Sequence, residues 1–345
     1  MYVLNNPASQ TFDREDYIGI RHLPFAGSIT DDPTMRFDST EDFGLFFARE
    51  LDHIKSRSYD KLYPEFTALK LFPISSEAPA GASTITFYGY DKVGEAQFIH
   101  DYSTDLPRAD VFGEPKTMNI KTLGTHYGYS NQEMRASRMT GKSLDVRRAE
   151  SAKYAVDYAT NRTAWAGDAS TGLQGVLSPS NDVPVFALPL NAAGTSTAFE
   201  DKTPREILDD IGAMVRFTAD ITNSVEQPDT LALPTKAYLH LFDTPRSDAS
   251  DLSVGEWVLK NMPRLKAIVE APELNPDSKI TPYPGIGVGF LFKKDRRKLT
   301  VEIPMPFYQY PVQARNLGFV VPCESRIAGT LIYYPMSMLI IPGVA

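Results

Sequence analysis

The clearest pattern of apolar and polar positions is a helical one between Ser143 and Ala166. Small or apolar side chains recur at alternating spacings of three and four, at Ala149, Ala152, Val156, Ala159 and Thr163. This spacing is typical of an α-helix, and so narrow a stripe lets the helix lie close against a sheet. With about 23 helical residues at 1.5 Å each, the predicted helix is about 35 Å long. That is long for a globular domain.

The middle of the chain alternates between helical and strand patterns. A second helix is predicted from Pro204, because proline at the first turn of a helix loses no hydrogen bond. The run Thr230 to Leu233 predicts a short buried strand, followed by a helix with Thr235 as its N-cap. A short helix in SVGEWVLKNMP and a strand in RLKAIVEAP come next. This part of the chain is therefore predicted to be α/β.

After Pro282 the pattern changes to strands separated by polar turns. The apolar runs are GIGVGFLF, KLTVEIPM, LGFVVPCE and AGTLIYYPMSMLII. The basic run KKDRRK, residues 293 to 298, lies between the first two. It could contact a phosphate, but a solvated hairpin turn is the favoured interpretation, since charged turns are common.

The N-terminal residues 1 to 40 predict an extended arm. Aromatic residues are scattered there among Pro, Asp and Gly without a sustained period, so the segment has too little apolar density for a core of its own. An amphipathic helix follows, with Ser39 placed three residues before Asp42 as a possible cap and Pro64 closing the region. An arm of this kind is expected to lie on another surface.

A long two-stranded protrusion is predicted next. The run TITFY, residues 84 to 88, predicts a strand, and KTMNIKT, residues 116 to 122, predicts its antiparallel partner. The connection between them is polar and broken by Gly and Pro. It is far longer than the usual connection of about 4 to 6 residues, so a functional excursion is favoured over an ordinary loop.

Composition limits the function classes. Of the 345 residues, 42% are hydrophobic and 11% aromatic, which is enough for buried cores. The formal charge of -8 argues against a dedicated nucleic-acid-binding protein. It fits a protein that encloses DNA better than one that binds DNA tightly. No apolar run approaches the length of a membrane span, and a soluble, non-secreted protein is expected. The single Cys323 excludes an internal disulfide.

The stretch GDASTGLQGVL, residues 167 to 177, raises the possibility of an active site. A nucleophile elbow needs glycine two residues before the serine, and Asp168 occupies that position relative to Ser170. A helix also precedes the stretch where an elbow needs a strand. A dinucleotide-binding fingerprint is also excluded, because Gly167, Gly172 and Gly175 are spaced five and three residues apart. A helix stop and turn, with Gly167 in the left-handed conformation, is the favoured interpretation.

Other chemical motifs are also weak. RMTGKS, residues 138 to 143, lacks the first glycine of a phosphate loop, so Gly141 is interpreted as a hinge and Ser143 as a helix cap. The histidines fall in separate segments without ligand-like pairing, at His22, His53, His100, His126 and His240. No catalytic residue, cofactor site or metal site is therefore predicted.

The order of the elements resembles the Hong Kong 97-type major capsid protein of tailed bacteriophages. The resemblance rests on NRTAWAGDASTGLQGVLS, on PDTLALPTKAYLHL and on the closing SRIAGTLIYYPMSMLIIPGV. In layout it covers nearly the whole chain. It implies an α+β fold with an N-terminal arm, an extended β-hairpin loop, a peripheral domain containing a long spine helix, and an α/β axial domain.

The resemblance also implies a division of the chain. Residues 1–75 would form the arm and amphipathic helix, 76–128 the extended loop, 129–184 the peripheral domain, 185–315 the axial domain, and 316–345 strands that return to the peripheral domain. The turn after the spine helix would be formed by Gly167, Gly172 and Gly175. Candidates for contacts between subunits are Phe87, Tyr88, Phe98, Tyr102 and Phe112.

The implied function is that of a structural shell protein without enzymatic activity. It would assemble into hexamers and pentamers of an icosahedral or prolate head in the host cytoplasm and enclose double-stranded DNA without reading its sequence. Scaffolding, portal and decoration proteins are possible separate partners, and no membrane is expected. The alternatives are an encapsulin-type nanocompartment with protein cargo and, from another class, a serine hydrolase using Ser170.

Overall fold

The computed structural model describes residues 65–98, 108–140, 145–247 and 251–345. These residues belong to one compact unit, Pro64–Ala345. The predicted N-terminal arm, the amphipathic helix that follows it, and Gly141 and Ser143 lie outside the described residues.

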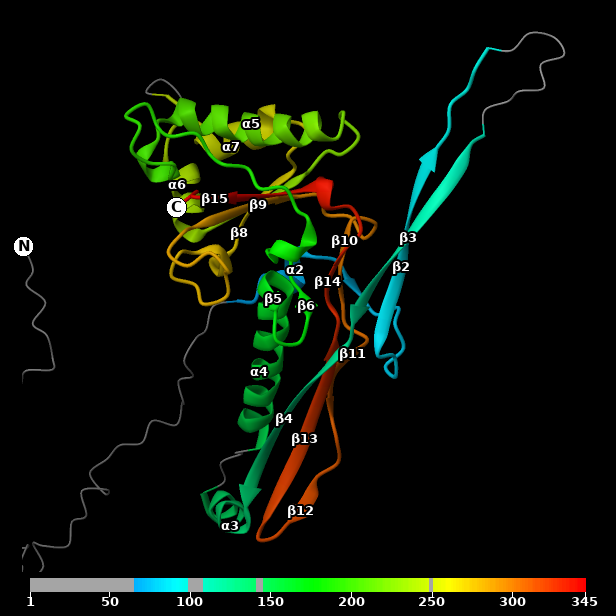
Figure 1. The fold of residues 1–345 in the computed structure, drawn as a ribbon. Helices are drawn as coiled ribbons and strands as arrows, with labels where there is room; N and C mark the ends of the chain where they lie inside the picture. Colours follow the sequence, from blue (N-terminus) through cyan, green and yellow to red (C-terminus); the bar gives the residue numbers. More distant parts are fainter. Residues whose placement is uncertain (1–64, 99–107, 141–144, 248–250) are drawn as a thin grey trace, which may run out of the picture. The chain divides into compact units, whose positions relative to one another are not determined.

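A four-stranded sheet covered by helices forms one body of this unit (Figure 1). Its strands, in sheet order, are β15 (Met338–Pro342), β9 (Val288–Phe292), β7 (Thr230–Leu233) and β8 (Ala267–Glu270). The helices packed on it are α5 (Pro204–Ile221), α6 (Thr235–Asp243) and α7 (Val254–Asn261). The predicted α/β character of the middle of the chain is thus confirmed.

The strands of this helix-covered sheet are buried on both faces. Along β9, Leu291 packs into the core beneath the helices, while Phe290 and Phe292 face a second core. Along β15, Leu339 and Ile340 divide between the two cores in the same way. Because successive side chains of a strand point to opposite faces, a strand between two cores is an almost continuous apolar run. The run MLII of β15 has this character.

Side-chain caps fix the starts of two of the helices. Thr203 and Glu206 form a capping box at α5, and Ser253 and Glu256 form another at α7. The predicted cap of α6 is wrong by one residue. Thr235 is the first helical residue, and its backbone N–H donates to Asn275 Oδ1 at 2.8 Å. A side chain 40 residues away therefore replaces the local cap, which no local pattern could indicate.

Two further sheets lie beside the long helix α4 (Asp145–Ala166). One contains β1 (Ile74–Ser75), β10 (Leu299–Glu302), β14 (Gly329–Ile332), β6 (Leu173–Gln174) and β5 (Gly167–Asp168). The other, named the long sheet, contains β4 (Lys121–Ser130), β13 (Gly318–Ile327), β11 (Met305–Gln309) and β12 (Gln313–Arg315). In the long sheet β4 and β13 pair along ten residues each.

The long helix confirms the sequence prediction. It contains 22 residues, which corresponds to about 33 Å. Ala152 and Val156 of the predicted stripe are buried, and Ala152 packs with Val321 and Cys323 of β13. A short helix, α3 (Asn131–Thr140), precedes α4 and was not predicted, because its polar sequence has no apolar stripe. The four-residue helix α2 (Ala68–Leu71) also contacts α4.

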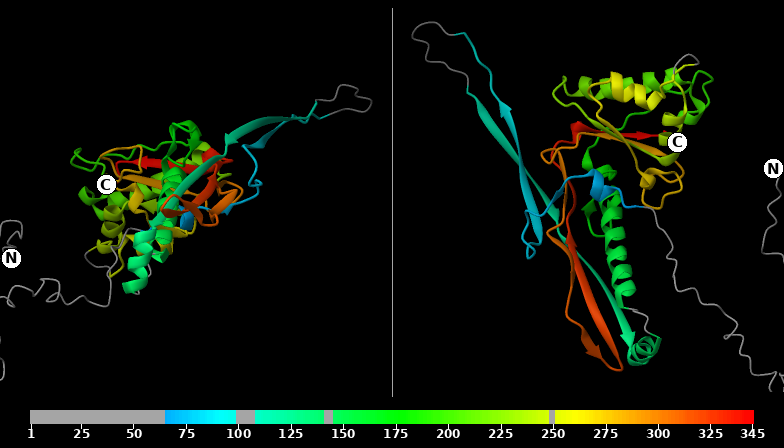
Figure 2. Two further views of the ribbon diagram at one scale, coloured as in Figure 1. Left: turned by 90° about the horizontal axis from the view of Figure 1, so that it is seen from below. Right: turned by 180° about the vertical axis from the view of Figure 1, so that it is seen from behind.

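The predicted two-stranded protrusion is present as β2 (Thr84–Val93) paired with β3 (Asp110–Asn119). All ten positions pair, from Thr84 with Asn119 to Val93 with Asp110. The distal part of this hairpin stands apart from the other described elements (Figure 2). The predicted partner strand 116–122 is corrected in one respect. The ladder ends at Asn119, and the chain continues into β4, which pairs with β13 instead.

Two expectations for the C-terminal part are also corrected. Residues 316–345 do not return together to the sheets beside α4, because β15 pairs with β9 in the helix-covered sheet. The basic run 293–298 is not a hairpin turn. β9 already pairs with β15 and β7 on its two edges, so β10 joins a different sheet and the run connects the two.

A buried ion pair fastens the loop before α5 to that helix. The side chains of Lys202 and Asp210 are 1% and 5% exposed, and the Lys202 ammonium donates to Asp210 Oδ2 and to the carbonyl oxygen of Pro189. Burial raises the pKa of the Asp210 carboxyl, and the hydrogen bond from Lys202 opposes this effect. Such a pair is costly to break one partner at a time, because the remaining group is buried without compensation.

We therefore expect Lys202→Met to lower the free energy of unfolding by about 3 to 5 kcal/mol, since it leaves the Asp210 carboxylate unpaired. Chemical denaturation followed by circular dichroism measures the change. Lys236→Met, at an exposed position of α6, is the matched control and should leave the unfolding free energy unchanged. Equal stability of the two variants would contradict the importance of the pair.

Candidate assembly surfaces

The first described residues are anchored to α4 by two buried polar side chains, Glu273 and Asn161. Thr67 donates to Glu273 through its backbone N–H at 2.9 Å and its hydroxyl at 2.6 Å. Asn161 donates to Glu273 Oε1 at 2.8 Å and accepts from the N–H of Ala68 at 3.0 Å. Glu273 and Asn161 are 5% and 0% exposed, so these hydrogen bonds replace the lost hydration. These hydrogen bonds fix the first described residues to α4.

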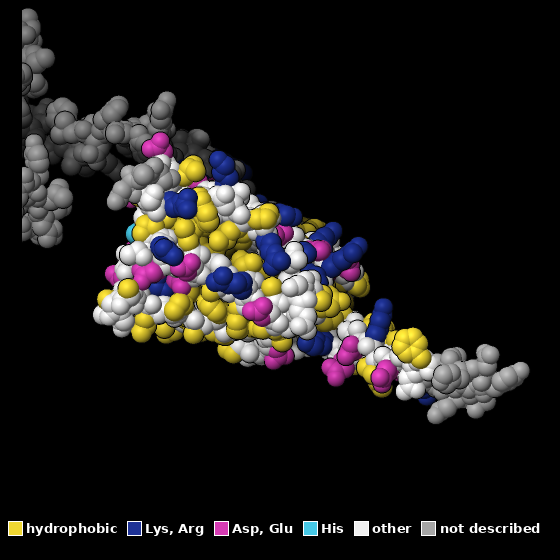
Figure 3. Space-filling view, turned by 90° about the horizontal axis from the view of Figure 1, so that it is seen from above, with side chains coloured by type: hydrophobic (Ala, Val, Ile, Leu, Met, Phe, Trp, Pro, Cys, Tyr) yellow, Lys and Arg dark blue, Asp and Glu magenta, His cyan; other side chains and the backbone are white. Residues whose placement is uncertain are grey.

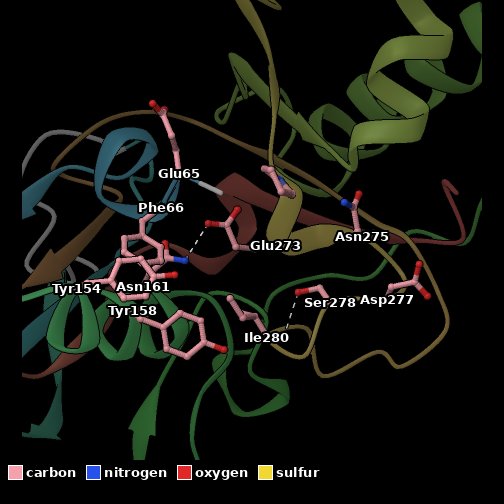
Figure 4. A pocket seen from close by; sticks show the side chains of 11 residues that line it. Glu65, Phe66, Tyr154, Tyr158, Asn161, Glu273, Asn275, Asp277, Ser278 and Ile280 are labelled. Atoms are coloured by element: carbon pink, nitrogen blue, oxygen red, sulfur yellow. Dashed lines mark hydrogen bonds between the residues drawn. The ribbon is translucent and has the colours of Figure 1, made fainter. Parts of the chain in front are cut away.

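A pocket of about 300 Å³ lies beside this anchor (Figure 4). Phe66 stands next to two rings of α4, with its centroid 5.0 Å from that of Tyr154 and 6.1 Å from that of Tyr158. Besides aromatic and carboxylate side chains, the pocket is lined by the amides of Asn161 and Asn275 and by Pro272, Ser278 and Ile280. Glu273 is already occupied by the anchor. Phe66, Tyr154 and Tyr158 thus pack the first described residues against α4.

An aromatic cluster lies at the C-terminal end of α2, where Phe72 is the C-cap residue. Phe72 is buried against Trp165 at the end of α4, with ring centroids 4.9 Å apart, and against Phe292 at 5.4 Å. Phe290 also contacts Trp165, at 6.2 Å. Edge-to-face contacts of this kind add to the apolar area that aromatic rings bury. The helix-covered sheet, α2 and α4 thus meet at one set of rings.

The glycine-rich stretch after α4 is a turn with specific steric demands. Gly167 has a φ of 74°, the left-handed conformation predicted for it, and Gly172 has a φ of 71°. Gly175 is needed for a different reason. A Cβ atom there would lie 2.6 Å from the carbonyl oxygen of Trp165, because the chain folds back tightly against the helix end. Leu177 N–H donates to that same Trp165 oxygen at 2.8 Å and satisfies a free carbonyl of the last turn.

Ser170 lies in this turn as a structural hydrogen-bond donor. Its hydroxyl donates to Asp168 Oδ1 at 2.8 Å, and its backbone N–H donates to the same oxygen at 3.1 Å. These hydrogen bonds, with one from Thr171, hold the pKa of the Asp168 carboxyl below its ordinary value. A hydrolytic serine needs a neighbouring general base, most often a histidine imidazole, to accept its proton. The structure pairs Ser170 with a carboxylate instead, as in a tight polar turn.

The hairpin has a packed base and an exposed outer part. At the base, Phe87 contacts Tyr333 of the same subunit with centroids 4.9 Å apart, and Met118 and Ile120 are buried in the same cluster. Beyond the base, large apolar side chains are exposed, namely Tyr88 (60%), Tyr90 (71%), Phe112 (60%) and Phe98 (107%). Tyr88 and Tyr90 share one face of the ladder and stack on each other, with ring centroids 6.3 Å apart.

The structure thus separates the predicted contact residues into two groups. Phe87 is partly buried within its own subunit, whereas Tyr88, Phe98 and Phe112 face solvent. Tyr102 lies outside the described residues. That these side chains contact another subunit stays a prediction. The sequence reasoning missed Tyr90, although its position two residues after Tyr88 places it on the same face of a strand.

Glu133 and Arg148 tie α3 to the far end of the long sheet. Glu133 forms a capping box with Ser130, and Arg148 of α4 binds both carboxylate oxygens, at 2.9 and 3.1 Å. The Arg148 guanidinium also donates to the carbonyl oxygen of Gly128. The hydrogen bond from Arg148, followed by that from the Ser130 backbone, lowers the pKa of Glu133 to about 2. Nothing in the local sequence pairs residues 15 positions apart, so this bridge was not predicted.

Across the described ranges, no group of three or more His, Cys, Asp and Glu side chains is arranged to hold a metal ion. No helix in the described part of the chain is long and apolar enough to cross a bilayer.

Solved structures with a similar fold include phage capsids. The capsid of Myoviridae phage XM1 matches with a TM-score of 0.72 and 17% identity, covering 87% of this chain and 99% of that one. The capsid of a native GTA particle matches with a TM-score of 0.61 and 9% identity, covering 90% and 100%. Mycobacterium phage Ogopogo matches with a TM-score of 0.58 and 12% identity, covering 88% and 98%. The predicted α+β fold of Hong Kong 97 type is confirmed.

The sequence itself shows the family. The family model described as major capsid protein matches residues 94–344. No curated protein sequence matches the chain. The chain belongs to the major capsid protein family of tailed phages; it is a structural protein that forms a phage head by assembling into a multimeric shell.

The glycine turn generates one prediction. Gly175→Val should destabilise the subunit by about 3 kcal/mol or more, because the added side chain collides with the backbone at the end of α4. Ser170→Ala removes only an exposed hydrogen bond and should change stability by no more than about 1 kcal/mol. Thermal unfolding of the two variants measures both changes in stability. A large loss of stability in Ser170→Ala would contradict the structural role given to that side chain.

The Glu133 bridge generates a pH prediction. Because the folded pKa of about 2 lies below the ordinary value of 4.5, the charged carboxylate contributes stability above pH 4.5 that is lost as the pH falls toward 2. Glu133→Gln should therefore show a smaller loss of stability over this interval, measured as the melting temperature at each pH. Arg148→Met should reduce the pH dependence in the same way. Unchanged pH dependence in both variants would refute the contribution of the bridge.

Proposed function

We propose that the shell is closed by the hairpin and the N-terminal arm, each of which is buried by a neighbouring subunit. The observation that carries this proposal is the contrast within β2–β3, where the base packs on its own subunit and the outer aromatic side chains are exposed. Single exposed apolar residues are ordinary, but a protruding ladder with a row of them marks an interaction surface. In a closed symmetric assembly every subunit both gives and receives such a contact.

The energy available from this contact is substantial. Burying a large apolar side chain contributes about 1.5 to 3 kcal/mol, and the hairpin offers Tyr88, Tyr90, Phe98 and Phe112. Ordering a flexible segment on binding costs conformational entropy. The β2–β3 ladder reduces that cost, because the strands are already paired before they meet another subunit.

In this proposal the subunits form hexamers and pentamers of an icosahedral or prolate head. Residues 129–184 with α4 serve as the peripheral domain, and the part of residues 185–315 up to the end of β9 serves as the axial domain near the fivefold and sixfold positions, because β10, β11 and β12 pair in the sheets beside α4. The separate helix-covered sheet, which contains β7, β8 and β9, supports that division. Residues 76–128 serve as the extended loop, and residues 1–75 include the arm.

The contents of the shell are proposed to be double-stranded DNA, held without sequence recognition. The net charge of -8 opposes tight binding to phosphates. On the face drawn in Figure 3, positive and negative side chains are interspersed and form no single-sign field. Assembly is proposed to take place in the host cytoplasm. The subunit is proposed to have no enzymatic activity.

Shortening the hairpin tests the proposal. Residues 91–112 would be replaced by Asn-Gly, which joins the register partners Tyr90 and Gly113 through a two-residue hairpin turn. The subunit should keep its fold, because the buried base is untouched, but closed shells should be lost. Circular dichroism measures the fold, and electron microscopy of the purified protein measures the shells.

The matched control is Glu114→Gln, which changes an exposed position of the same ladder without shortening it, and it should assemble normally. Closed shells from the shortened subunit would refute the role of the hairpin. A purified wild-type protein that stays a monomer with esterase activity dependent on Ser170 would overturn the whole proposal. Shells filled with protein cargo would instead indicate a nanocompartment.

A further inference from the structure

Among the segments that join the helix-covered sheet to the sheet of β10 and β14 are two connections that contact each other. The first is the basic run 293–298, which leads from β9 to β10. The second runs from β14 to β15 through Tyr333, Tyr334 and the short helix η7 (Pro335–Ser337). Relative movement of the two sheets must bend both connections. Contacts between these connections therefore help to hold the angle between the sheets, together with the core that the two sheets share.

Lys298 binds the two connections together. Its carbonyl oxygen accepts from the N–H of Tyr333 at 2.9 Å, and its ammonium lies 4.2 Å from the ring centroid of Tyr334. The same ammonium pairs with Glu226, and the two side chains are only 17% and 10% exposed. A cation held between a carboxylate and a ring at low exposure is attracted more strongly than at the open surface.

The contacts continue from Lys298 in two directions. Glu226 follows α5, and its N–H donates to Thr222 Oγ1 at 3.2 Å. The contacts of Lys298 therefore reach the C-terminal end of α5. Tyr333 contacts Phe87 at the base of the hairpin. The group named the Lys298 node, consisting of Glu226, Lys298 and Tyr334, thus connects the end of α5 with the support of the hairpin.

We propose that Lys298 is a positioning residue for assembly. Its side chain sets the angle between the helix-covered sheet and the sheet of β10 and β14, and by holding Tyr334 it positions the neighbouring Tyr333, which supports the hairpin, so the curvature of the shell depends on it. This inference rests on the proposed function. In this proposal Lys298 of the basic run binds Glu226 inside the subunit and does not bind a phosphate.

The test compares the shells formed by several full-length variants. Lys298→Met removes the charge but keeps an unbranched chain, and the double variant E226Q/K298M leaves neither charge unpaired. Lys298→Arg keeps the cation and serves as the conservative rescue. Arg297→Met is the matched control, because Arg297 is exposed on the same connection and its side chain has no hydrogen bond or ion pair with the described residues.

Electron microscopy measures shell diameters, and thermal unfolding measures the subunit. Arg297→Met and Lys298→Arg should give the wild-type diameter. The double variant should melt near the wild-type temperature but give a broadened range of diameters and open shells. Hydrogen exchange should rise at residues 84–88 and 222–228 in that variant and not in Arg297→Met.

Wild-type diameters and exchange in a folded double variant would overturn the inference. Loss of folding in both Lys298→Met and the double variant would overturn it too, because Lys298 would then stabilise the core and not set an angle. These results differ from failure of the proposed function, in which the wild-type protein itself forms no shells.

Discussion

The packing of aromatic rings at the end of α4 is the interaction on which the rest of the subunit depends. Phe72, Trp165, Phe290 and Phe292 come from three distant parts of the chain and meet there without a polar partner between them. The helix end, the first described segment and the helix-covered sheet are thereby fixed to each other. A long helix is stable when a face of it is buried by tertiary packing, and this cluster supplies that burial at one end.

The same cluster explains why the glycine turn is so tight. Once Trp165 is buried, the chain must leave α4 without displacing it, and only a residue lacking a side chain fits against the Trp165 carbonyl. The turn then supplies β5 and β6 to the sheet that contains β14. The stretch that looks most like an active site in the sequence is therefore a consequence of packing, and its serine and threonine serve to hold Asp168 in place.

Sequence reasoning succeeded where a local pattern carries the information. The period of α4, the proline start of α5 and the apolar run of β9 are encoded within each element, so they were predictable. It failed where partners are distant. The Asn275 cap of α6, the Glu273 and Asn161 anchor and the assignment of β15 to the helix-covered sheet depend on residues far away in the chain. The exposure of the aromatic side chains on the hairpin could be read only from the structure, because nothing in the sequence distinguishes the partly buried Phe87 from the exposed Phe112.

Cys323 has a practical consequence for labelling. It is the single cysteine of the chain, it packs against Ala152 inside the subunit, and burial raises the pKa of its thiol. Since the thiolate is the reactive form, this native sulfur is protected from alkylating reagents and oxidants in the folded protein. A cysteine introduced on the exposed face of the hairpin then becomes the one accessible attachment point. Dyes, spin labels or crosslinkers can thus be placed at a chosen position of the subunit without removing a natural residue elsewhere.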